Sequence, residues 1–182
     1  MRATLDSSLA AHACSTRAFP DATKRHVFLA NRSIMNTDKV IQLLDRILEM
    51  ELAGVVRYTH YSLMVFGPHR IPIVEWLRGQ ATESLMHAQE AGERITDLGG
   101  HPSLRIGPLL ETEKHDIEDI LRESLGHERE TLQLYRELEQ TVKGESILLE
   151  EFARGKILQE ESHLGEVDKM LRKPGDLDPV RA

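Results

Sequence analysis

Residues 157–167 read ILQEESHLGEV, and this stretch places a carboxylate and an imidazole where a helix would bury apolar side chains. Ile157, Leu164 and Val167 follow the three- and four-residue steps of one helical face, and Glu160 and His163 interrupt that face. With 30 acidic residues and 9 histidines in 182, one Glu-x-x-His pair can arise by chance on a solvated helix. The pair therefore indicates a site only if other helices offer matching ligands.

The composition favours long amphipathic helices in a single domain. The 182 residues suffice for one hydrophobic core, aromatic residues make up 4% and charged residues 29%. The net charge of −7 argues against a nucleic-acid partner and is compatible with cation binding. The single cysteine, Cys14, excludes an internal disulfide and a thiolate zinc site. Charges interrupt every long segment, so we expect no membrane span and a cytoplasmic location.

The helical spacing of apolar residues, in steps of three and four, begins only after residue 34. Residues 1–34 show no sustained period, and we expect a flexible N-terminal extension there or translation upstream of a natural start at Met35. A processed targeting peptide is the alternative. The bundle is expected over residues 35–173, followed by a tail at 174–182. The period and the glycine and proline breaks predict helices over 37–65, 73–98, 116–142 and 145–171.

The links between these helices predict the topology. The first two helices and the last two are joined by short links, which make each pair antiparallel. Residues 101–114, HPSLRIGPLLETEK, hold two prolines and a glycine and are longer than a usual bundle turn. The second and third helices should therefore run parallel, in an all-α four-helix bundle with one long crossover.

Each predicted helix carries a carboxylate in its apolar stripe. Glu51, Glu128 and Glu160 each stand three residues after one apolar residue and four before another, and Glu83 and His87 lie on the seam of the second helix. Unpaired carboxylates in a core would cost roughly several kcal/mol each, which a bound cation removes. Glutamate and histidine suit iron, manganese or zinc. Two metals can be held by four glutamates and two histidines: Glu51, Glu83, His87, Glu128, Glu160 and His163.

Other histidines are predicted to lie outside this site. His127 has Ser124, Glu130 and Thr131 as neighbours on its helix, so we expect it to face solvent. His60, His69 and His101 are also expected at the surface or in loops.

In this order, the segments resemble those of the ferritin superfamily, most closely bacterioferritin, over about residues 36–173. MELAGVVRYT (50–59) resembles the first-helix segment, with Glu51 as terminal ligand and Tyr58 close to the site. LMHAQEAGERITDLGGHPSL (85–104) and DIEDILRESLGHERETL (116–132) resemble the second and third, with His87 and Glu128 as ligands. ILQEESHLGEVDKML (157–171) resembles the fourth, with Glu160 bridging and His163 terminal.

The second helix departs from the family pattern at two positions. The family's bridging glutamate comes three residues before its histidine, where this chain has Ser84, and Glu83 stands four before His87. We expect Glu83 to reach the site and bridge; the alternative is a carboxylate at the edge, with one metal held well and one poorly. The family's haem methionine precedes that histidine by two residues, where this chain has Leu85, and Met86 is about 100° away. We expect no haem, and Met86 to pack in the core or an interface.

The resemblance implies iron storage and detoxification by a ferroxidase. Fe(II) would be oxidised by O2 or H2O2 at a di-iron site and stored in a homo-oligomeric shell of 24 subunits, with Tyr58 either relaying an electron or making a buried hydrogen bond. One alternative is a rubrerythrin-like di-metal oxidase or peroxidase without a cage. Another is a helical scaffold protein with a degenerate metal site, for which Ser84 is the best evidence.

Overall fold

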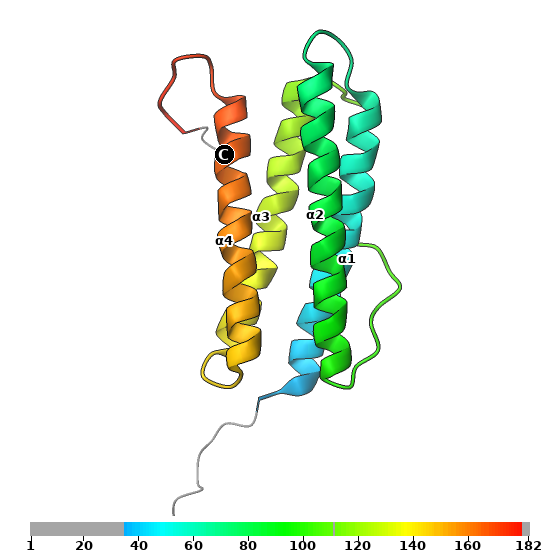
Figure 1. Ribbon diagram of the computed structural model, residues 1–182, viewed down its shortest axis with the longest axis vertical. Helices are drawn as coiled ribbons and strands as arrows, with labels where there is room; N and C mark the ends of the chain where they lie inside the picture. The colour runs from blue at the N-terminus through cyan, green and yellow to red at the C-terminus, as the bar shows by residue number, and fades with distance from the viewer. Residues whose placement is uncertain (1–34, 111, 180–182) are drawn as a thin grey trace, which may run out of the picture. The chain divides into compact units, whose positions relative to one another are not determined.

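The computed structural model describes residues 35–110 and 112–179, which form a bundle of four long helices (Figure 1). No strand occurs within these described ranges. The predicted helix ranges are confirmed to within three residues at each end, and the predicted extension at 1–34 lies outside the described residues. The helices are α1 (Thr37–Met64), α2 (Arg70–Asp97), α3 (Ile117–Val142) and α4 (Ile147–Leu171).

Side-chain caps fix where three of the helices begin. Asn36, Asp116 and Ser146 precede α1, α3 and α4, and each side chain accepts a hydrogen bond from a backbone N–H of the first turn. α2 begins at Arg70, three residues before the predicted start. Pro72 is tolerated so early in a helix because first-turn N–H groups have no partner within the helix.

The crossover lies along α1. α2 and α3 run in the same direction, as predicted, and the connecting chain returns beside the bundle (Figure 1). The N–H of Gly107 donates to the carbonyl of Glu49 at 2.7 Å, and the N–H of Ser103 donates to Oδ1 of Asp45 at 2.9 Å. A Cβ at residue 107 would lie 2.9 Å from that carbonyl oxygen, so only glycine allows the backbones to come this close.

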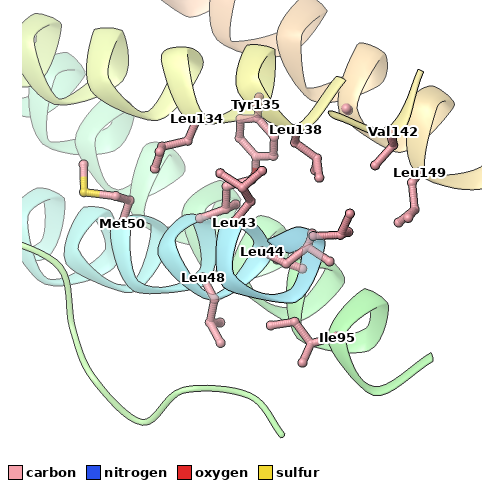
Figure 2. Packing of buried hydrophobic residues seen from close by; sticks show 14 of the residues in the cluster. Leu43, Leu44, Leu48, Met50, Ile95, Leu134, Tyr135, Leu138, Val142 and Leu149 are labelled. Atoms are coloured by element: carbon pink, nitrogen blue, oxygen red, sulfur yellow. The ribbon is translucent and has the colours of Figure 1, made fainter. Parts of the chain in front are cut away.

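Apolar clusters occupy both ends of the bundle and leave a polar layer between them. The larger cluster, which includes Leu44, Ile95, Leu138 and Leu149, gathers side chains from all four helices where α1 and α4 begin (Figure 2). Two smaller clusters around Leu77, Ile120 and Val167 fill the other end. Each fully buried leucine contributes about 1.5–3 kcal/mol, so these clusters stabilise the frame that holds the polar layer.

Of the predicted tail, residues 174–179 are described, and the guanidinium of Arg172 donates to the carbonyl of Leu177 at 3.0 Å. Within the described part of the chain, none of the helices combines the length and apolarity needed to cross a membrane.

Candidate metal centre

The structure brings five of the six predicted ligands into two clusters that share one glutamate. The ligand atoms of Glu51, His87 and Glu160 lie within 4.8 Å of one another, and so do those of Glu128, Glu160 and His163. All four helices contribute to the clusters. The three carboxylates are buried, since Glu51, Glu128 and Glu160 are 3%, 6% and 2% exposed. Sequence reasoning thus located a compact acidic centre in the middle of the bundle.

His87 is oriented by two of these carboxylates. Its Nδ1 lies 3.3 Å from Oε1 of Glu51 and 3.2 Å from Oε1 of Glu160. Burial lowers the pKa of His87, but the carboxylates of Glu160 and Glu51 outweigh it and raise the pKa to about 9. A proton on Nδ1 therefore lies between two carboxylates, in the place that a bound cation would take.

The donor set fits divalent cations. Burial raises the pKa of Glu51, and burial together with the adjacent Glu160 carboxyl raises the pKa of Glu128. Oε2 of Glu160 is buried and has no hydrogen-bond partner among the residues that the structure describes. Carboxylate oxygens and imidazole nitrogens without a thiolate are the donors that iron, manganese and zinc accept. A pair of such ions would offset the charge that burial makes costly.

Two buried tyrosines hold the terminal carboxylates in a crossed arrangement. Tyr58 on α1 donates to Glu128 on α3, while Tyr135 on α3 donates to Oε1 of Glu51 on α1 at 2.8 Å. Burial raises the pKa of both phenols well above the usual value, so both remain donors. Tyr58 lies at the site, as expected. Tyr135 was missed, although the sequence held a signal: it follows Glu128 by seven residues, as Tyr58 follows Glu51.

Glu83, the sixth predicted ligand, lies outside both clusters. Its Oε1 is 3.8 Å from Nε2 of His87, and its Oε2 is 3.2 Å from Nε2 of His163. These are the ring nitrogens opposite the ones that face the buried carboxylates. Ser84, at the position where the family pattern has the bridging glutamate, is buried in the same layer. The carboxylate of Glu83 therefore approaches the histidines from outside the cluster.

The prediction that His127 faces solvent was wrong. Its side chain is only 4% exposed, and its ring makes an edge contact with Tyr58, with centroids 6.3 Å apart. The prediction treated Ser124 and Thr131 as residues of a solvated face, but both are buried. Each hydroxyl donates a hydrogen bond to a carbonyl of the preceding turn, so burial leaves no hydroxyl without a partner. Burial, together with the charge of Arg57, lowers the pKa of His127 to about 4, which keeps it neutral.

The remaining side chains singled out in the sequence lie away from the centre. His69 and His101 are exposed, as predicted. Leu85 and Met86 are 42% and 46% exposed on α2, so Met86 is not part of the core, and the absence of haem remains a prediction.

Comparisons with known proteins place the fold. Residues 41–174 match the family model described as a ferritin-like domain. A ferritin-like, diiron-carboxylate protein from Bacillus anthracis str. Ames superposes with a TM-score of 0.71 at 23% identity, covering 75% of this chain and 97% of that one. The dodecameric thioferritin of Bacteroides fragilis gives 0.70 at 22% identity, covering 75% and 86%. At this level of identity, the two likenesses establish the fold alone.

Bacterioferritin is among the similar structures. That of Rhodobacter capsulatus, solved with a metal-free dinuclear site and haem iron, gives a TM-score of 0.65 at 26% identity, covering 74% of this chain and 84% of that one. Comparison with curated protein sequences gives no match. Because the family model spans most of the bundle, this chain belongs to the ferritin-like domain family.

Proposed function

We propose that this protein is a ferroxidase, which oxidises Fe(II) to Fe(III) between its four helices and stores the product in an oligomeric shell. The observation that carries the proposal is the pair of buried clusters joined by Glu160. A bundle that needed only stability would fill this layer with apolar side chains, since three buried carboxylates repel one another.

We propose a role for each ligand on the basis of the two clusters. Glu51 and His87 would hold one Fe(II), Glu128 and His163 would hold the other, and Glu160 would contact both. When bound, the two Fe(II) ions would each lose one electron; with two protons from water, the two electrons convert O2 to H2O2, or H2O2 to two waters. Carboxylate ligands favour the higher charge of Fe(III), so the site promotes loss of these electrons.

Neighbouring residues hold the ligands in place. The hydroxyl of Tyr58 donates a hydrogen bond to Glu128, and the hydroxyl of Tyr135 donates one to Glu51. Each carboxylate keeps its other lone pairs for an ion. Apolar clusters pack on either side of the polar layer and bury its carboxylates. Exclusion of water strengthens the attraction between carboxylates and cations.

The shell is the part of the proposal that depends on assembly. The B. fragilis thioferritin is described as dodecameric. On the likeness to bacterioferritin, we propose a shell of 24 subunits for this chain. Phe66, Ile71 and Leu104 are 71%, 80% and 93% exposed, which offers apolar surface to neighbouring copies. We place the protein in the cytoplasm, without nucleic-acid or membrane partners.

The test is stopped-flow absorbance of Fe(III) formation after Fe(II) is mixed with O2 or H2O2. The wild type should oxidise Fe(II) rapidly, with a burst that saturates at two irons per chain. Glu160→Ala should abolish the burst. Glu161→Ala is the matched control, because Glu161 is the next residue on α4 but is exposed and pairs with Arg136.

Two outcomes would redirect the proposal. Saturation well below two irons, with oxidation unaffected by Glu160→Ala, would favour a helical scaffold protein. Rapid oxidation by a dimer that holds no iron core, as measured by light scattering with iron absorbance, would favour a di-metal oxidase without a cage.

A further inference from the structure

We propose that Glu83 is a positioning residue whose single carboxylate holds the outer nitrogens of both metal-binding histidines, and that it is not a metal ligand. This inference rests on the proposed function, because it assumes that His87 and His163 bind cations. It replaces the bridging role that the sequence suggested for Glu83.

Both histidines turn the same ring nitrogen toward Glu160. Nδ1 of His87 lies 3.2 Å from Oε1 of Glu160, and Nδ1 of His163 lies 4.0 Å from Oε2 of the same residue. Both rings therefore turn Nδ1 toward the shared carboxylate. Because the two nitrogens of an imidazole point away from each other, both rings turn Nε2 away from the ion sites.

Glu83 lies beside the other ring nitrogen, Nε2, of each histidine. Its Oε2 lies 3.2 Å from Nε2 of His163, a hydrogen-bond length, and its Oε1 lies 3.8 Å from Nε2 of His87, within ion-pair range. An oxygen that accepts a hydrogen bond from Nε2 of His163 lies on the opposite side of that ring from an ion bound at Nδ1. The side chain of Glu83 is also 26% exposed, whereas the side chain of Glu160 is 3% exposed, so Glu83 lies nearer to solvent than the shared carboxylate does.

The register of α2 explains this placement. Successive residues of a helix are separated by about 100°, so a carboxylate at residue 83 points to a different side of α2 from one at residue 84. Ser84 faces the buried layer, where its hydroxyl is too short to bridge two ions. Glu83 instead reaches across to His163 on α4.

The chemical consequence follows from the needs of a metal-bound imidazole. A histidine that binds an ion through Nδ1 carries its proton on Nε2. A carboxylate that accepts a hydrogen bond from this N–H fixes the tautomer and the ring orientation. Glu83 already lies at hydrogen-bond distance from Nε2 of His163, whereas the buried Nε2 of His87, 3.8 Å away, has no hydrogen-bond partner among the described residues. A small shift of the Glu83 carboxylate would let it serve both rings. Loss of such a partner typically weakens metal binding by roughly 10- to 100-fold without removing a ligand.

The test is titration of the metal-free protein with Co(II), followed by visible absorption and calorimetry. Glu83→Ala should still bind two Co(II) per chain, with both affinities roughly 10- to 100-fold weaker. Glu83→Gln, whose amide oxygen can still accept one hydrogen bond, should lose less. Glu93→Ala removes the same charge from an exposed position on α2 and should bind as the wild type does.

The outcomes separate this inference from the proposed function. A wild type that binds no Co(II) overturns the function itself. A wild type that binds two ions while Glu83→Ala and Glu83→Gln bind one identifies Glu83 as a ligand and overturns the inference alone. Unchanged affinities in both variants also overturn it. If Glu83→Ala fails to fold by circular dichroism, the Gln variant decides.

Discussion

Two hydrogen bonds at the centre join the terminal carboxylates to tyrosines on another helix. The hydroxyl of Tyr135 is the phenolic donor to Glu51, and that of Tyr58 is the donor to Glu128. A buried carboxylate that loses its donor remains desolvated without compensation. The stability of the metal-free protein should therefore depend on both hydroxyls.

Tyr135→Phe tests this dependence. We expect the free energy of unfolding of the metal-free protein to fall by about 1–3 kcal/mol in urea denaturation, because Glu51 loses a buried partner. Tyr58→Phe should have a similar effect through Glu128. The loss should shrink when Co(II) is bound, since the cation then compensates the carboxylate. Equal stability of wild type and Tyr135→Phe without metal would show that the bond contributes nothing.

At this scale, the sequence predicted which carboxylates would be buried but not how each side chain would be directed. Glu51, Glu128 and Glu160 were found because each interrupts an apolar stripe. The role of Glu83 was harder to predict, because residues three and four positions apart are both neighbours on a helix surface. The spacing alone does not show which ring nitrogen of His87 the carboxylate approaches. His127 was misplaced because small hydroxyl residues can be buried by bonding to their own backbone.

At the scale of the helices, α1 comes close to α2 and α3 at Gly54, one turn after Glu51. A Cβ at this position would lie 2.7 Å from Oγ of Ser84 and 3.1 Å from Nε2 of His127. The lack of a side chain at Gly54 therefore makes room for two polar groups beside the candidate metal centre. Glycine is needed at this position because a Cβ would be too close to its neighbours, and not because of an unusual backbone angle.

Gly54→Ala should destabilise the protein by about 1–3 kcal/mol through overpacking, although alanine is favoured over glycine by about 1 kcal/mol inside helices. Ser84→Ala in the same chain should recover part of the loss, because it removes the nearest atom. Gly155→Ala is the control: no atom lies within 4 Å of its added Cβ, so thermal melting should show stabilisation. A Gly54→Ala variant as stable as Gly155→Ala would mean that the helices can separate freely.

The helices themselves were predictable for physical reasons. Each has an apolar stripe at helical spacing, and three begin at an Asn, Asp or Ser that caps the first turn. The start of α2 was predicted late because Pro72 resembles a boundary but is accepted in a first turn. The path of the crossover along α1 depends on the close approach of Gly107 to Glu49, which no periodicity reveals.

At the scale of the whole molecule, the acidic layer separates apolar clusters that would otherwise form a continuous core. Bound cations should therefore stabilise the entire bundle, since all four helices supply ligands. Binding to the folded state alone adds about 2.7 kcal/mol when the free ion is at 100 times its dissociation constant.

Differential scanning calorimetry checks this effect. Co(II) should raise the melting temperature of the wild type, and a chelator should reverse the rise. Glu160→Ala should show a much smaller rise, because both ion positions lose their shared carboxylate. An equal rise in the two proteins would place the stabilising ions elsewhere on the acidic surface.

In the function proposed for this chain, the buried carboxylates and histidines hold two iron ions that share Glu160. The most direct measurement is anomalous diffraction at the iron edge from crystals soaked anaerobically in Fe(II). We expect two peaks inside each bundle, one between Glu51, His87 and Glu160 and one between Glu128, His163 and Glu160. Anomalous density only on the exterior, with these five side chains left without an ion, would contradict the account.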